Sequence, residues 1–383
     1  MNSDHKPPLI DLWIFGPERG CLMRQVSIIR AMRQQKPVRI RLFVHPGHRE
    51  LTSQLLPGSD TDILTYPGGL TFVYNEQLDF KVSATFRAIL RYAFYDGWRD
   101  FRYFLKAVKQ ERPVLIVNDF LPLVPLYAQL TKIPVAGVYN YLLAETSLGK
   151  GPLRRLLGWC VKRLFLLVYR LCHLLVLERL QPSSDHHLGN QVPLVARSQT
   201  RPADVVRQQI AAADKPLIFL SLGGGNTPLT ERYLARFGTI AREGRWQFLL
   251  LPRTPEEEEY LRREQSEFLI GNNQWVETQD IIAACDLVIT RAGFSTVAEC
   301  LKARVPPLIW HLATHPEIRE TDDELLRSGL SAGRLYPDDD TDVLREKIAR
   351  ALDAAEVRGR IADIPTDGAE QTAALILKML DQA

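Results

Sequence analysis

Short runs of apolar and β-branched residues alternate with stretches of helical periodicity along most of the chain. Such alternation is typical of βαβ units, whose strands form one parallel sheet. Because the runs are apolar throughout, helices must cover both faces of each sheet. The predicted strands are residues 9–15, 39–45, 114–119, 133–139 and 173–178 in a first series, and 216–223, 246–252, the neighbourhood of Trp275 and Val276, 286–290 and 306–311 in a second.

A polar segment separates the two series. Residues 181–202 are rich in Pro, Ser, Gln and Asn and lack clear periodicity, as expected of a hinge. We therefore predict an α/β protein with two doubly wound domains, residues 1–185 and 186–383. The length of 383 residues agrees with this division, since domains hold roughly 150 residues each.

The composition narrows the function classes. Lys and Arg number 48 and Asp and Glu 45, a balance that argues against a nucleic-acid binder. The five cysteines are scattered without a Cys-x-x-Cys pair, which predicts a reducing compartment and no zinc site. The first apolar run contains Asp11 and is too short for a signal peptide, and no run is long enough to span a bilayer. We expect a cytoplasmic protein.

The loops after the strands carry the candidate chemistry, because ligands of parallel sheets bind beyond the carboxyl ends of the strands. The loop 221–228, SLGGGNTP, lies between a strand and a helix. Its glycines allow close approach of the backbone and the helix N-terminus attracts anions, so Gly223, Gly224, Gly225 and Asn226 form a candidate diphosphate site. The same glycines also suit a plain tight turn. The spacing differs from that of a P-loop, which disfavours ATP hydrolysis.

A second loop begins with Arg291 and Gly293 and leads into a helix that starts near Ser295. Glu299 lies in the first turns of that helix, where a carboxylate can accept hydrogen bonds from two vicinal hydroxyls such as those of a ribose. A third loop, residues 311–323, gathers His315, Glu317, Arg319 and Glu320. So much hydrogen-bonding capacity suits a sugar.

These residues carry a family resemblance. Residues 286–329 (DLVITRAGFSTVAECLKARVPPLIWHLATHPEIRETDDELLRSG) resemble the C-terminal signature of family 28 glycosyltransferases of the MurG type, which combines a Gly-rich loop, an R-[AS]-G-x-x-T-x-x-E motif and a His/Gln-rich loop. Residues 16–32 resemble the G-x-x-x-G-H stretch that opens these proteins, and residues 118–135 resemble their central segment. The resemblance spans nearly the whole chain and is more specific in the C-terminal half.

The resemblance implies a GT-B fold, in which two Rossmann-like domains face each other across a cleft. The N-terminal domain would bind the acceptor and the C-terminal domain the nucleotide-sugar, with UDP as the expected nucleotide. It also implies inversion at the anomeric carbon without a metal or a cofactor, with helix dipoles and N–H groups stabilising the leaving diphosphate.

The resemblance also assigns roles to residues. Gly223–Gly225 would line the diphosphate, Glu299 would hold the ribose, and Arg291 to Thr296 would wrap the nucleotide. The backbone near Val276 would meet the base, and the loop from His315 to Glu320 would contact the donor sugar and phosphate.

Two departures from the family pattern affect catalysis and donor choice. Cys21 stands where the family has a histidine, and a thiol is a poor proton acceptor. Asp119, at the end of a predicted strand, is the replacement we name as general base, although it can equally cap the next segment. Glu317 and Glu320 stand near the family's glutamines, so the donor preference can differ from N-acetylglucosamine.

Residues 153–171 form an amphipathic helical pattern. One arc is apolar and includes Leu167, while the other carries the basic residues together with Trp159 and Leu166. That second arc suits insertion into an anionic headgroup layer. An ordinary domain helix with a few exposed apolar side chains fits equally well.

The leading hypothesis is a glycosyltransferase that moves a sugar from a nucleoside-diphosphate sugar to a glycan or lipid-linked acceptor, with peripheral contact to the cytoplasmic membrane face through residues 153–171. A nucleotide-sugar hydrolase or epimerase on the same scaffold is the nearest alternative. The third is a degenerate GT-B protein that binds without turnover, which Cys21 motivates. His45 and His48 are best interpreted as ordinary loop residues.

Overall fold

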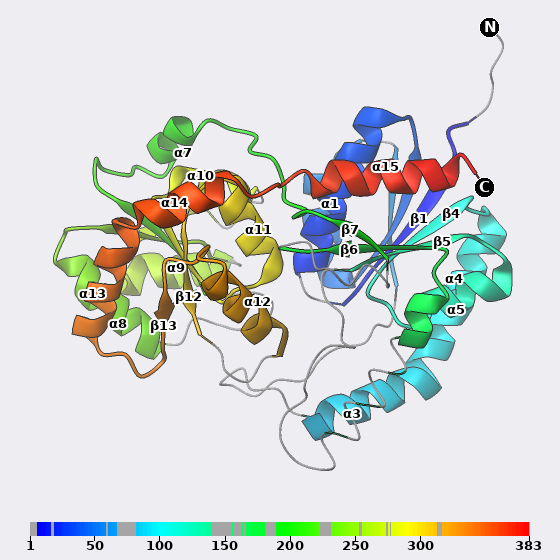
Figure 1. The fold of residues 1–383 in the computed structure, drawn as a ribbon, viewed down its shortest axis with the longest axis horizontal. Helices are drawn as coiled ribbons and strands as arrows, with labels where there is room; N and C mark the ends of the chain where they lie inside the picture. Colours follow the sequence, from blue (N-terminus) through cyan, green and yellow to red (C-terminus); the bar gives the residue numbers. More distant parts are fainter. Residues whose placement is uncertain are drawn as a thin grey trace, which may run out of the picture. The chain divides into compact units, whose positions relative to one another are not determined.

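The computed structural model describes residues 6–16, 19–58, 60–66, 82–139, 155, 159, 163, 166–180, 189–222, 231–252, 255–272, 275, 277–311 and 316–382. The chain divides into two compact units, Met1–Val195 together with Asp367–Ala383, and Ala196–Thr366. Each unit contains one sheet of parallel strands (Figure 1). The division differs from the predicted one at residue 185, because ten further residues and the C-terminal segment belong to the first unit.

The first unit has a seven-stranded sheet in the order β3-β2-β1-β4-β5-β6-β7, with every neighbouring pair parallel. Its strands are β1 (Leu9–Ile14), β2 (Arg39–Val44), β3 (Thr61–Thr65), β4 (Leu115–Asp119), β5 (Val135–Tyr139), β6 (Leu174–Glu178) and β7 (Asn190–Val192). Its helices are α1 (Arg19–Gln35), η1 (Pro46–His48), α2 (Arg49–Leu55), α3 (Val82–Arg91), the π-helical η2 (Tyr92–Asp96), α4 (Gly97–Gln110), α5 (Val124–Thr131) and α15 (Gly368–Leu380).

The second unit has a six-stranded sheet in the order β10-β9-β8-β11-β12-β13, again parallel throughout. Its strands are β8 (Leu217–Ser221), β9 (Gln247–Leu250), β10 (Leu269–Ile270), β11 (Leu287–Thr290), β12 (Pro307–Trp310) and β13 (Arg334–Leu335). Its helices are α7 (Ala203–Gln209), α8 (Glu231–Arg242), α9 (Pro255–Glu264), α10 (Thr278–Ala284), α11 (Phe294–Lys302), α12 (Pro316–Arg327), α13 (Thr341–Leu352) and α14 (Ala355–Ala362).

The strand order reverses once in each sheet, between β1 and β4 and between β8 and β11. The first six strands of each sheet therefore follow the Rossmann order, in which the chain leaves the two central strands in opposite directions and opens a crevice at their carboxyl ends. The prediction of two doubly wound domains is confirmed.

One predicted strand is wrong. Trp275 lies outside any strand, and its backbone N–H donates to Asn272 O at 3.1 Å. The indole ring lies under the guanidinium of Arg201, 5.0 Å from the ring centroid. The strand at this edge of the sheet is β10, which pairs with β9 earlier in the chain.

The C-terminal helix α15 returns to the first unit and lies beside α1 (Figure 1). Its apolar face is buried, with Ala373 and Ile376 wholly inaccessible to solvent. Gly368 begins the helix and donates its N–H to Leu194 O at 3.1 Å. A Cβ at this position would lie 2.0 Å from Pro193 O, so only glycine fits. Burial of one face and this close contact explain why the last 17 residues join the first unit.

Candidate functional site

The switch point of the second unit, where β8 and β11 lie side by side and the strand order reverses, is followed by one loop and one helix that contain five of the predicted donor residues. β11 ends at Thr290, and α11 begins at Phe294 with Gly293 as its N-cap. Between them, Ala292 is buried and has a φ of 56°. A left-handed alanine costs about 1 kcal/mol or more and is found mainly where the fold constrains the turn.

Of the predicted donor residues, five belong to this loop and helix. They are Arg291, Gly293, Ser295, Thr296 and Glu299. The first four are half-buried and Glu299 is 5% exposed. Glu320 lies half-buried on α12. Gly223, Gly224, Gly225, Asn226, Val276 and His315 lie outside the described residues, as does the side chain of Glu317.

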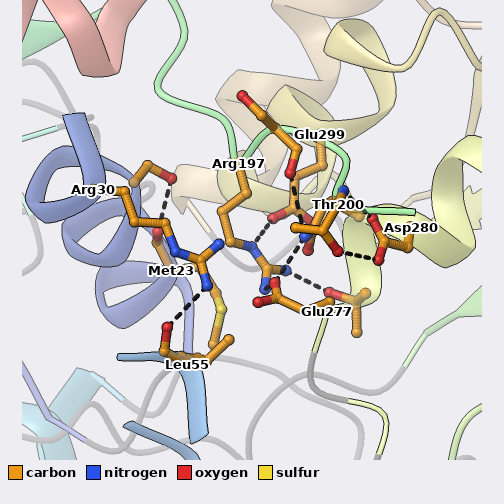
Figure 2. Close-up of polar contacts among 12 residues, drawn as sticks. Met23, Arg30, Leu55, Arg197, Thr200, Glu277, Asp280 and Glu299 are labelled. Atoms are coloured by element: carbon orange, nitrogen blue, oxygen red, sulfur yellow. Dashed lines mark hydrogen bonds and ion pairs between the residues drawn. The ribbon is translucent and has the colours of Figure 1, made fainter. Parts of the chain in front are cut away.

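Glu299 is held by an arginine that precedes the sheet in sequence. The Nε of Arg197 donates to Oε1 of Glu299 at 2.6 Å, and the Arg197 side chain is only 1% exposed (Figure 2). Within the described part of the chain, the other carboxylate oxygen, Oε2, accepts no hydrogen bond. An ionised carboxylate keeps several lone pairs after one such bond, so Glu299 can still accept from a ligand.

The two Nη groups of the Arg197 guanidinium reach the start of α10. Nη2 donates to Thr278 Oγ1 at 2.6 Å, and Nη1 lies 3.4 Å from Glu277 Oε2. Farther along the segment, the N–H and hydroxyl of Thr200 both donate to the buried carboxylate of Asp280, at 2.7 and 2.6 Å (Figure 2). The segment 197–201 is therefore fixed against α10 and α11 by charged hydrogen bonds.

His311, Asp322 and Arg334 form a further polar cluster beside the third predicted loop, residues 311–323. This cluster was not predicted from the sequence. His311 follows β12, and its Nδ1 lies 2.5 Å from Oδ2 of the buried Asp322. Oδ1 of Asp322 accepts from Arg334 Nε at 2.8 Å. With both oxygens engaged, Asp322 fixes the orientation of the imidazole at this strand end. Among the described residues no group of three or more His, Cys, Asp or Glu could hold a metal ion.

The switch point of the first unit is occupied by a buried ion network. Asp119 ends β4 and has no exposed surface. Arg24 on α1 donates to its two oxygens, with Nη2–Oδ1 at 2.5 Å and Nε–Oδ2 at 3.1 Å, and Gln25 donates to Oδ2 at 2.9 Å. A general base must reach the acceptor hydroxyl with a lone pair. In this arrangement both oxygens of Asp119 already serve α1, so its role as a base stays a prediction.

Glu178, at the end of β6, completes this network. Its Oε2 lies 3.4 Å from Arg24 Nη1, and its Oε1 accepts the backbone N–H of Val195 at 2.6 Å. Complete burial raises the pKa of Glu178 to about 7, although Arg24 and the Val195 N–H favour the charged form. Neither Glu178 nor Arg24 was predicted, because nothing in their apolar sequence surroundings distinguishes them from surface charges.

Three candidate residues of the N-terminal half, Cys21, His45 and His48, make local contacts. Cys21 lies in the first turn of α1, half-buried, with Arg24 Nη2 3.7 Å from its Sγ. His45 caps η1 by accepting the N–H of Gly47 at 3.2 Å, and partial burial lowers its pKa. His48 is buried at the start of α2. The two histidines are loop and cap residues, as interpreted from the sequence.

The amphipathic pattern of residues 153–171 is described in part. Trp159 is 54% exposed with the Arg163 guanidinium over its ring, whereas Leu166 packs against the core of the first unit. Leu167, expected to face the sheet, is 58% exposed, and the neighbouring Val168 is buried. The assignment of Leu166 and Leu167 to opposite faces was therefore inverted. No described helix is long and apolar enough to cross a membrane.

Comparisons with known proteins agree on the fold. No family model matches the chain. An uncharacterized glycosyltransferase of Methanopyrus kandleri is 24% identical over 292 residues, which cover 72% of this chain and 78% of the relative. A UDP-glucosyltransferase of Polygonum tinctorium is similar in structure over 100% of both chains, with a TM-score of 0.68 and 14% identity.

Two further solved structures extend the likeness. UGT2 of Phytolacca americana, in complex with UDP-2fluoro-glucose and pterostilbene, has a TM-score of 0.66 at 16% identity and covers 98% of this chain and 99% of its own. The glycotransferase of kitacinnamycin has a TM-score of 0.66 at 17% identity with the same coverage. The closer resemblance to family 28 stays a prediction, and the chain has the GT-B glycosyltransferase fold.

Proposed function

We propose that this chain is a glycosyltransferase that transfers a sugar from a UDP-sugar to an acceptor hydroxyl. The observation that carries the proposal is Glu299, a carboxylate beside the switch point with one oxygen fixed by Arg197 and the other not engaged by any described residue. Two vicinal ribose hydroxyls are donors suited to that oxygen. Structures with the same fold have been solved with UDP and with UDP-glucose.

The chemistry proposed is a single displacement that inverts the anomeric carbon. The acceptor oxygen forms a bond to that carbon as the bond to the diphosphate breaks, and UDP leaves. The N-terminus of α11, which follows Arg291 and Gly293, directs backbone N–H groups and a partial positive charge at the leaving diphosphate. These groups support a transfer without a metal or cofactor.

In this displacement the acceptor hydroxyl loses its proton to a general base. Asp119 remains our candidate because it ends β4 at the carboxyl edge of the first sheet. Asp119→Asn should lower turnover about 100-fold if the carboxylate takes the proton. Near-normal turnover in the folded variant would leave Asp119 as a structural partner of Arg24.

For the acceptor, we propose a glycan or a lipid-linked molecule reached at the cytoplasmic membrane face. The exposed Trp159 and Leu167 and the exposed basic residues Arg155, Arg163 and Arg170 support such contact. Sedimentation with vesicles of anionic and of neutral lipids tests it. Absence of binding to both kinds of vesicle would remove the membrane from the proposal, and equal binding to the two would remove the basic residues from it.

The function itself is tested by thermal unfolding with UDP, dTDP, GDP and ADP and their sugar conjugates, since a ligand of the folded state raises the melting temperature. A shift with the UDP series, followed by sugar transfer to a glycan or lipid acceptor, is the expected result. Release of free sugar without an acceptor would favour a hydrolase. Binding without turnover would favour a degenerate binding protein, and no shift at all would remove the nucleotide-sugar from the proposal.

A further inference from the structure

The chain entering the second unit contributes a charged side chain to the candidate nucleoside site. The unit begins at Ala196, so Arg197 is its second residue. The Arg197 side chain has almost no exposed surface, and its hydrogen bonds go to Glu299 on α11 and to Thr278 on α10. An arginine buried to this degree is held by its ionic partners rather than by solvent.

We infer that Arg197 is a positioning residue of the nucleoside site, which holds the Glu299 carboxylate turned so that Oε2 accepts the ribose hydroxyls. The inference rests on the proposed function, because it takes the ribose as the ligand of Glu299. It adds a residue that lies about 100 positions before Glu299 and that no motif of the sequence marks.

The burial of Glu299 makes this partner necessary. A carboxylate that is 5% exposed is poorly hydrated, so its orientation depends on the cation and the hydrogen bonds that the protein supplies. The 2.6 Å bond from Arg197 Nε to Oε1 supplies the compensating charge and leaves Oε2 for a ligand.

The guanidinium also joins two parts of the candidate site. Its Nη groups face Thr278 Oγ1 at 2.6 Å and Glu277 Oε2 at 3.4 Å, and Glu277 follows the position predicted to meet the base. One planar group with fixed donor directions therefore holds Glu299, the carboxylate proposed for the ribose, and the start of α10, next to the position predicted to meet the base. A lysine has a single point charge and cannot make the same set of bonds.

The backbone on both sides of Arg197 is fixed as well. Lys302, on the same helix as Glu299, donates to Ala196 O at 3.2 Å and to Thr366 O at 3.4 Å. Thr200 is held by Asp280 through two hydrogen bonds. Arg197 is therefore placed before any ligand arrives, which is the condition for a positioning role.

The test compares two nucleotides that differ only in the ribose hydroxyls. Isothermal titration calorimetry with UDP and with 2′,3′-dideoxy-UDP gives the ratio of their affinities for the full-length wild type, for Arg197→Met and for Arg197→Lys. We expect the wild type to prefer UDP by about tenfold or more, the scale of a hydrogen bond to a charged group. In Arg197→Met the ratio should fall close to one, and Arg197→Lys should lie between.

The matched control is Arg207→Met. Arg207 is also a hydrogen-bonded arginine of this unit, but its partners are Asp286 and the carbonyls of Ala284 and Lys215. This variant should keep the wild-type ratio. Thermal unfolding of every variant confirms that the protein titrated is folded, and Arg197→Lys provides the measurement if Arg197→Met does not fold.

The outcomes separate the inference from the function on which it rests. A wild type that binds neither nucleotide overturns the proposed function. A wild type that discriminates, together with Arg197 variants that discriminate equally, overturns the positioning role. So does an equal loss of affinity for both nucleotides in the Arg197 variants, because that result describes a structural role unrelated to the ribose.

Discussion

Among the described residues, Arg24 of the first unit and Arg197 of the second are buried near the switch points of their sheets, and they differ in what they leave for a ligand. Arg24 lies between Asp119 and Glu178, both fully buried, and every carboxylate oxygen of the pair has a donor. Arg197 engages one oxygen of Glu299 and leaves the second without a described partner. We call the Arg24–Asp119–Glu178 network closed and the Arg197–Glu299 network open. A closed network contributes to stability and fixes strand ends, whereas an open one retains an acceptor atom that can bind a ligand.

The two networks also hold neighbouring residues of the same connecting chain. Val195 donates its N–H to Glu178 in the first unit, and Arg197, two residues later, pairs with Glu299 in the second. The hinge predicted at residues 181–202 therefore ends in a segment that is anchored on each side by a buried carboxylate.

The largest loss of stability should come from removing the arginine of the closed network. Arg24→Met leaves two carboxylates buried without their cation and should lower the free energy of unfolding by about 3–5 kcal/mol. Urea denaturation of the variant measures it. A loss below about 1 kcal/mol would mean that Asp119 and Glu178 find other partners or water. Arg197→Met serves as the comparison, since it leaves one carboxylate, that of Glu299, almost fully buried without its cation, while its second partner Glu277 is 14% exposed.

The closed network should also give stability a pH dependence. Burial raises the pKa of Glu178 from 4.5 to about 7, so the folded state binds a proton more tightly than the unfolded one. Its contribution is present below pH 4.5 and is lost as pH rises to about 7, a change of about 3 kcal/mol at 1.36 kcal/mol for each unit of pKa.

Glu178→Gln should remove this contribution. The glutamine cannot ionise, so the free energy of unfolding of the variant should change less between pH 5 and pH 8 than that of the wild type. Urea denaturation at the two pH values checks it. Asp11, whose pKa burial raises to about 6, titrates in the same direction and remains in both proteins. Parallel pH curves for variant and wild type would contradict the assignment to Glu178.

A substitution in the open network should change UDP affinity more than it changes the free energy of unfolding. Glu299→Gln retains the shape of the side chain but lacks the charge, and it should weaken UDP binding by about 1–3 kcal/mol. Calorimetric titration of the folded variant measures the loss. Unchanged UDP affinity would contradict the placement of the ribose at Glu299 and with it the difference drawn between the two networks.

The sequence predicted the interior of both sheets and missed their edges. In the described part of the chain, the nine strands with a neighbour on each side all lie within predicted runs. The strands not predicted are β3, β7, β10 and β13, and each lies at an edge of its sheet. Interior strands are buried on both faces and therefore appear in the sequence as apolar runs. Of the edge strands, β3 is partly exposed, and β10 and β13 have only two residues each.

The candidate site was predictable only where it follows a motif. The loop after β11 and Glu299 lie together as the spacing implied, because a strand, turn and helix in succession fix their geometry locally. Arg197 and Arg24 could not be found in this way. Their partners lie 102 and 95 positions away, and only the tertiary fold brings those charges together.

The smallest effect should come from an arginine on the same sheet that lacks burial. Arg39 forms two hydrogen bonds with Glu111, at 2.6 and 2.9 Å, but the two side chains are 25% and 47% exposed. Arg39→Met should therefore lower the free energy of unfolding by less than about 1 kcal/mol, and the loss should shrink at high salt. Urea denaturation at low and high ionic strength measures both. A loss as large as that of Arg24→Met would show that ion pairing alone, rather than complete burial of the carboxylates, accounts for the stability of the closed network.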